Sequence, residues 1–158
     1  MSNRQQLLQE RAARRAEELN RHMLSQGRSK EQLVKKKILI VDDQEMFRNT
    51  HLSFFNPDIY EVYLASSGEE ALDMIKNRPN VFDTILTDLN MRPGMNGDQF
   101  IQICRSIPGY QNKPIVLISA EDPRELHQIA NAAGANFYFS KPANPIAVLS
   151  FLEPFFYE

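Results

Sequence analysis

Residues 84–91 read TILTDLNM, a short apolar run that ends on the carboxylate of Asp88. Burying a carboxylate costs free energy unless the group is paired or takes part in chemistry. Three other apolar runs also end on polar residues: KILIV (37–41) leads into Asp42 and Asp43, PIVLIS (114–119) closes on Ser119, and NFYFS (136–140) leads into Lys141. The repeated pattern predicts that these polar residues share one site.

Apolar runs alternate with stretches of helical period from residue 37 onward. The run that holds Asp88 extends back to residue 81, and a fifth run, YEVYLAS (60–66), carries Glu61 and is predicted to be an edge strand. Nearly continuous apolar runs are typical of parallel strands covered on both faces. Five strand–helix units therefore predict an α/β fold, a parallel sheet with helices on both faces and right-handed crossovers.

Capping residues mark the predicted helices. Ser67 and Glu70 have the spacing of a capping box, and Asp122–Pro123 and Asn144–Pro145 are typical helix starts. Gly134 is the predicted stop of the helix that begins at Pro123. Two further helices are expected at 44–55 and 98–107, and only EPFFYE is expected to follow the last helix.

The charge is divided unevenly along the 158 residues. Residues 1–37 carry ten Lys and Arg against four Glu, whereas the rest of the chain carries eight against sixteen Asp and Glu. The length fits one domain with a core, so we predict a basic helical extension at 1–34 and one acidic domain at 35–158.

The extension shows a thin apolar stripe at helical spacing, followed by Gly27 as a stop; the stripe comprises Leu8, Ala12, Ala16, Leu19 and Met23. Four roles of this extension remain open. It could pair with a second copy as a homodimer, dock on its own domain, bind another protein, or stay solvated. Nucleic-acid binding is disfavoured because no aromatic residue accompanies its arginines, which are Arg11, Arg14, Arg15 and Arg21.

Several classes of protein are disfavoured. No apolar stretch approaches the roughly 18 residues of a membrane span, and the N-terminus has no signal-peptide core. Cys104 is the single cysteine, which excludes a disulfide framework and fits a reducing cytoplasm. The three histidines are scattered and predict no metal cluster.

The acidic strand ends predict a metal site. Carboxyl ends of parallel strands meet at one edge of the sheet, which brings Asp42, Asp43 and Asp88 together. Two carboxylates about 4 Å apart repel by roughly 4 kcal/mol at an effective dielectric constant near 20, and Lys141 supplies one positive charge only. Oxygen ligands favour Mg²⁺, with Asp43 and Asp88 as direct ligands and Asp42 acting through water.

Beside such a cation, Asp88 is suited to attack a phosphoryl group and form an aspartyl phosphate. Ser119 and Lys141 are then expected to hydrogen-bond or neutralise the phosphoryl oxygens. Asn90 and Glu121, each two residues past a strand end, are expected to set the lifetime of the phosphate.

The segments VDD (41–43), TDLNM (87–91), ISA (118–120) and SKP (140–142) together resemble the receiver domains of two-component response regulators, over about 37–155. The resemblance implies a flavodoxin-like, doubly wound five-stranded sheet of order 2-1-3-4-5. It implies a stand-alone signalling switch rather than an enzyme, phosphorylated on Asp88 by a histidine kinase or histidine phosphotransfer protein and acting on a downstream protein target. It also implies a backbone carbonyl of Asn90 as a metal ligand, Ser119 and Tyr138 as switch residues, and a cis peptide at Lys141–Pro142.

One segment departs from the family pattern. The family usually reads Met-Pro-x-Met-x-Gly after the phosphoacceptor, whereas residues 91–97 read MRPGMNG, with one extra residue before Pro93. The extra residue is expected to reshape the loop and to alter partner choice or phosphate lifetime.

Two other functions remain open. A phosphatase with an Asp nucleophile usually carries a second Asp two residues later, but this chain has Asn90 there. The chain could also be the regulatory receiver of a longer protein whose output module lies elsewhere. Dinucleotide binding is disfavoured because no glycine-rich phosphate loop follows any predicted strand.

Overall fold

The structure, a computed structural model, describes residues 3–25, 35–78 and 81–157. Five parallel strands form one sheet in the order β2-β1-β3-β4-β5, as the resemblance implied. The strands are β1 (Lys36–Val41), β2 (Tyr60–Ala65), β3 (Thr84–Asp88), β4 (Ile115–Ser119) and β5 (Phe137–Ser140). The predicted edge position of 60–66 is confirmed, since β2 pairs with β1 alone.

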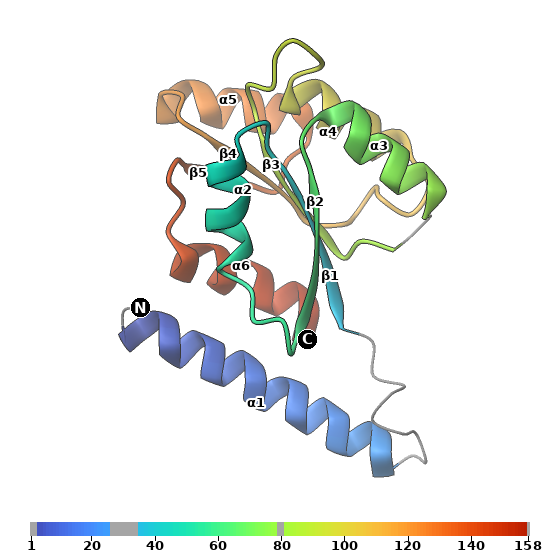
Figure 1. The fold of residues 1–158 in the computed structure, drawn as a ribbon, viewed down its shortest axis with the longest axis vertical. Coiled ribbons are helices and arrows are strands. Elements are labelled where there is room, and N and C mark those ends of the chain that lie inside the picture. Colours follow the sequence, from blue (N-terminus) through green and yellow to red (C-terminus); the bar gives the residue numbers. More distant parts are fainter. Residues whose placement is uncertain (1–2, 26–34, 79–80, 158) are drawn as a thin grey trace.

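Helices cover both faces of the sheet (Figure 1). They are α1 (Asn3–Ser25), α2 (Glu45–Leu52), α3 (Gly68–Asn77), α4 (Gly97–Ser106), α5 (Pro123–Ala133) and α6 (Pro145–Tyr157). Alternate strand residues face opposite cores. Leu39 and Ile85 pack with α3, α4 and α5, whereas Ile40 and Leu86 pack with α6 and with the segment that follows α2. Burial on both faces explains why these strands read as continuous apolar runs.

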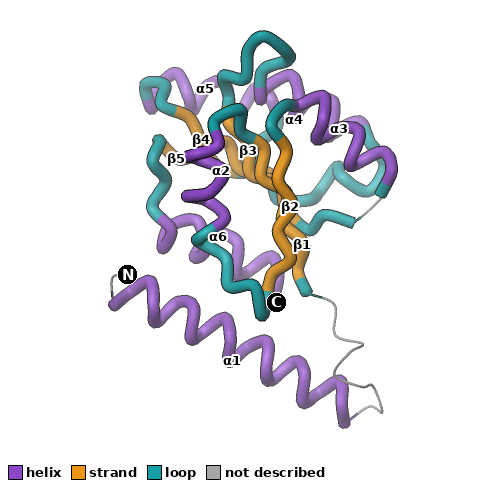
Figure 2. Tube along the Cα trace, in the orientation of Figure 1, coloured by secondary structure: helices purple, strands orange, loops and turns teal. Residues whose placement is uncertain are grey.

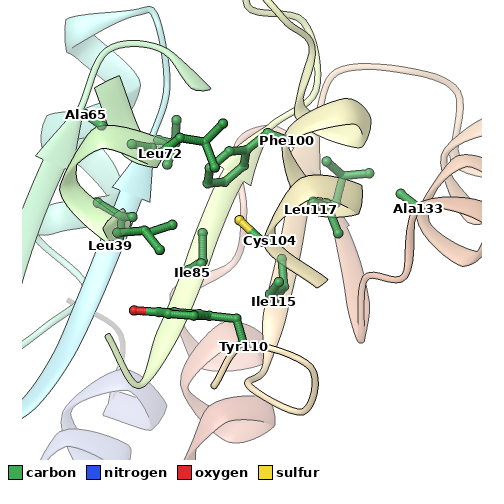
Figure 3. Packing of buried hydrophobic residues seen from close by; sticks show 14 of the residues in the cluster. Leu39, Ala65, Leu72, Ile85, Phe100, Cys104, Tyr110, Ile115, Leu117 and Ala133 are labelled. Carbon is green, nitrogen blue, oxygen red and sulfur yellow. The ribbon is translucent and has the colours of Figure 1, made fainter. Parts of the chain in front are cut away.

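The core under α3, α4 and α5 is closely filled by large side chains (Figure 3). Phe100, Cys104 and Tyr110 are fully buried in it. Burial raises the pKa of the Cys104 thiol to about 12, so this cysteine serves as a small apolar core residue.

The caps behave largely as predicted. The Ser67 hydroxyl accepts a hydrogen bond from the backbone N–H of Glu70 at 3.0 Å, but the Glu70 carboxylate accepts from Ser66 rather than from Ser67. The Asp122 carboxylate accepts from the N–H of Arg124 at 2.8 Å, and Gly134 ends α5 with a φ of +95°. These caps fix the directions in which the helices leave the sheet.

Three predicted boundaries were wrong by more than one residue. The expected helix at 44–55 is shorter, since α2 covers Glu45–Leu52. Strand β3 begins at Thr84, because Asp83 leaves the strand and its carboxylate accepts the N–H of Lys37 at 2.8 Å. Helix α6 runs on to Tyr157, because Phe156 is buried with its ring 5.9 Å from that of Tyr60.

Helix α1 packs alongside α6 of its own chain (Figure 2). The Nε atoms of Arg11 and Arg15 lie 3.5 and 3.3 Å from Oε1 of Glu153, which is buried. Leu8 of the predicted stripe is half-buried, but the side chains of Ala12, Ala16, Leu19 and Met23, and Gly27 itself, lie outside the described residues. Among the described helices, none is both long and apolar enough to cross a bilayer.

Candidate functional site

The four predicted strand ends lie at the same edge of the sheet. Asp88 is the last residue of β3 and Ser119 the last of β4, while Asp42 directly follows β1 and Lys141 directly follows β5. A backbone hydrogen bond of 2.8 Å from the Lys141 N–H to the Ser119 carbonyl ties two of these ends together. Parallel pairing therefore brings the predicted residues to one place.

Three carboxylates form a cluster at this edge. Oxygens from Asp42, Asp43 and Asp88 all lie within 4.8 Å of one another. Asp42 and Asp88 are buried, whereas Asp43 is exposed and leaves the cluster open to solvent on one side. All of the donor atoms are carboxylate oxygens, a set that fits a hard divalent ion such as Mg²⁺.

The ammonium of Lys141 partly neutralises the cluster. Its Nζ lies 2.8 Å from Asp42 Oδ2 and 3.3 Å from Asp88 Oδ1, and its side chain is only 6% exposed. The Nζ also lies 4.0 Å from the centre of the Phe47 ring, which supports the cation from α2. Lys141 is thus held in a fixed position rather than in solvent.

The acid–base behaviour of Asp88 is shifted by this environment. Burial raises its pKa from 3.8 to about 6, and the negative charge of Asp42 adds to the effect. Lys141 and the N–H of Leu89, which donates to Oδ1 at 2.8 Å, oppose the rise. Asp88 therefore binds a proton more readily than a free aspartate does, and a cation in the cluster would compete with that proton.

Gly97 lies directly against the backbone of Asp88. A Cβ at this position would lie 1.9 Å from the Asp88 carbonyl oxygen, closer than atoms can approach. The Gly97 N–H also donates to the Leu89 carbonyl at 2.7 Å. The sequence motif contained this glycine, but only the structure shows that it closes the loop onto the β3 end.

The two residues predicted to set the phosphate lifetime contact each other. The side-chain amide of Asn90 donates to the Glu121 carboxylate at 3.0 Å, and the Glu121 N–H donates to the buried hydroxyl of Ser119 at 3.2 Å. The β3 and β4 loops are thereby joined beside the acidic cluster.

Tyr138 lies on β5 and points toward α5. Its hydroxyl is 3.1 Å from Nδ1 of His127, and the two rings meet edge to face at 5.4 Å. No local pattern in the sequence indicates this partner, because the two residues are eleven positions apart on different elements.

The loop with the extra residue is held by α3. The N–H of Met95 donates to the Glu69 carboxylate at 2.7 Å, a bond that lowers the pKa of Glu69. The peptide bonds Arg92–Pro93 and Lys141–Pro142 are both cis, and the second was expected from the resemblance.

The sequence is also similar to those of known proteins. The family model of the response regulator receiver domain matches residues 38–153. The chain is 32% identical over 111 residues to sporulation initiation phosphotransferase F of Bacillus subtilis, covering 70% of this chain and 85% of that protein. It is also 32% identical over 121 residues to the chemotaxis protein CheY homolog of Campylobacter jejuni, covering 74% of this chain and 89% of that protein.

Solved structures agree with these sequence matches. The chemotaxis response regulator CheY4 of Vibrio cholerae superimposes with a TM-score of 0.67 at 33% identity, covering 77% of this chain and 99% of that one. The sheet order, the strand-end carboxylates and these matches point to one conclusion: the chain belongs to the response regulator receiver family.

Proposed function

We propose that Asp88 accepts a phosphoryl group from the phosphohistidine of a histidine kinase or histidine phosphotransfer protein. In this step the phosphorus–nitrogen bond breaks, a bond forms between phosphorus and an Asp88 oxygen, and the released imidazole takes up a proton. The supporting observation is the convergence of Asp42, Asp43 and Asp88 within 4.8 Å, beside the buried ammonium of Lys141.

The cluster and the Asn90 carbonyl would hold Mg²⁺, which supplies charge neutralisation to the phosphoryl oxygens when bound. Lys141 would pair with one of those oxygens, and the supporting observation is that its Nζ lies 3.3 Å from Oδ1 of Asp88. The Ser119 hydroxyl would donate to another of those oxygens, since the hydrogen bond that it accepts from the N–H of Glu121 does not use the hydroxyl proton. Asn90 and Glu121 would restrict the approach of a hydrolytic water.

The phosphorylated form would act as a switch rather than as a catalyst. Movement of Ser119 toward the phosphate and of Tyr138 inward would change the surface formed by residues 120–145. A downstream protein would recognise that changed surface. Helix α1 contacts α6 of its own chain. If two copies exchanged this helix, each α1 would contact α6 of the other copy, and a homodimer would form.

The test uses acetyl phosphate as a small phosphodonor in the presence of Mg²⁺. The intact protein should gain the mass of one phosphoryl group, and Asp88→Asn should abolish the gain. Asp73→Asn, a change at an exposed position of α3, should leave it intact. Equal uptake by Asp88→Asn and the unmodified protein would show that Asp88 is not the acceptor.

A further inference from the structure

A histidine on α5 holds the hydroxyl of the predicted switch tyrosine. Nδ1 of His127 lies 3.1 Å from the Tyr138 hydroxyl oxygen, and the ring planes meet at 70°. His127 is exposed, while Tyr138 is half-buried and packs against the core under α3, α4 and α5. The hydrogen bond therefore ties the tip of a core-facing side chain to the outer surface of α5.

The second nitrogen of His127 also has a partner. Nδ2 of Asn131, one helical turn further along α5, lies 3.2 Å from Nε2 of His127. The amide nitrogen of Asn131 can only donate, so Nε2 of His127 accepts this hydrogen bond. In this tautomer the ring carries its proton on Nδ1, and Nδ1 donates to the Tyr138 hydroxyl oxygen. Contacts at both nitrogens fix the direction in which the His127 ring points.

We propose that His127 is a positioning residue that holds Tyr138 in its unphosphorylated position and so opposes the switch. This inference rests on the proposed function, in which Tyr138 turns inward after Asp88 is phosphorylated. The hydroxyl cannot stay bonded to the outer side of α5 while its ring moves toward β4, so the bond must break. The net free energy of a typical intramolecular hydrogen bond corresponds to about a fivefold change in an equilibrium constant.

Beryllofluoride, a phosphoryl mimic, tests the idea in the presence of Mg²⁺. His127→Leu should bind the mimic about fivefold more tightly than the unmodified protein. His127→Asn, which keeps a polar atom near the Nδ1 position, should restore weaker binding. In a Tyr138→Phe background, His127→Leu should change the affinity by less than about twofold, because the bond is already absent.

A spectroscopic readout follows Tyr138 itself. The chain has five tyrosines, so Tyr138→Phe identifies the ring signals of Tyr138 in an NMR spectrum. In His127→Leu without the mimic, these signals should shift toward their positions in the mimic-bound protein. This measurement distinguishes release of the tyrosine from a general loss of stability.

Two results would overturn the proposal. One is that His127→Leu binds beryllofluoride with the same affinity as the unmodified protein and that its Tyr138 ring signals do not shift. The other is that His127→Leu raises the affinity for beryllofluoride equally in the unmodified and Tyr138→Phe backgrounds, since His127 would then act through packing alone. Failure of the unmodified protein to bind the mimic would instead overturn the proposed function, and this inference with it.

Discussion

Nζ of Lys141 lies 2.8 Å from Oδ2 of Asp42, and both side chains are almost completely buried. The shortest ion pair of this lysine is thus with Asp42, while its distance to Asp88 is 3.3 Å. One ammonium faces three carboxylates, so the cluster keeps a negative charge that a cation can relieve. The arrangement therefore suits a bound cation and holds the lysine beside Asp88.

Lys141→Met should destabilise the protein by about 3 kcal/mol near neutral pH, because it leaves buried carboxylates without a counter-charge. Urea unfolding followed by circular dichroism measures the change. Lys113→Met is the matched control: its Nζ is 3.9 Å from a partly exposed Asp83, so the expected loss is below about 1 kcal/mol. Equal losses in the two variants would contradict the role given to Lys141.

Asp88→Asn should become more stable than the unmodified protein as the pH rises. The folded-state pKa of Asp88, about 6, lies above the ordinary value of 3.8. Between these values the folded protein holds more protons than the unfolded chain, so the contribution of Asp88 to stability falls with rising pH. From pH 4 to 7 the advantage of Asp88→Asn should grow by on the order of 2 kcal/mol, measured by urea unfolding without Mg²⁺. A difference independent of pH would show that the Asp88 pKa is not raised.

Mg²⁺ should stabilise the unmodified protein by about 1.4 kcal/mol at ten times its dissociation constant. Asp43→Asn should raise the Mg²⁺ concentration that gives the same stabilisation by about tenfold or more, because the change removes a charged oxygen ligand. Asp43 is exposed, so the stability without metal should change little. Asp58→Asn, at another exposed position, serves as the control for surface charge.

Gly97→Ala should destabilise the protein by about 2–4 kcal/mol and weaken Mg²⁺ binding, since the new Cβ displaces the backbone that carries Asp88. Thermal unfolding with and without Mg²⁺ measures both effects. Gly94→Ala is the control with a smaller expected loss, because its Cβ would meet the end of the exposed Glu69 side chain, which can move at the cost of its hydrogen bond to Met95. A mild effect of Gly97→Ala would mean that the loop adapts without moving Asp88.

Glu153→Gln should loosen α1, because Arg11 and Arg15 lose their shared carboxylate partner. Hydrogen exchange within residues 3–25 should speed up, while exchange in β1, β3 and β4 should stay the same. Glu125→Gln, at an exposed position of α5, should leave α1 unchanged. Unchanged exchange in α1 with Glu153→Gln would show that this ion pair does not hold the helix.

Much of the fold followed from local pattern. The apolar runs, Asp122, Asn144 and Gly134 predicted strands and helix ends because burial and capping act on neighbouring residues. The site prediction used one more rule, that parallel strands end at the same edge. The side-chain roles at that edge, including those of Ser119 and Asn90, remain predictions from the sequence.

Other features depend on residues far apart in the sequence. The Phe47 ring beneath Lys141, the His127 partner of Tyr138 and the contact of Gly97 with Asp88 each join separate elements. Arg105 is a further case, because its guanidinium donates to backbone carbonyls at Tyr110, Lys113 and Gly134.

By itself, the sequence determined the order of the elements and which residue types end each strand, because hydrophobic period and capping are properties of short segments. The tertiary structure alone decided that α1 lies against α6, that Lys141 pairs most closely with Asp42, and that Tyr138 is bonded to α5. These contacts depend on helix packing and side-chain direction over long sequence separations, which no local pattern specifies.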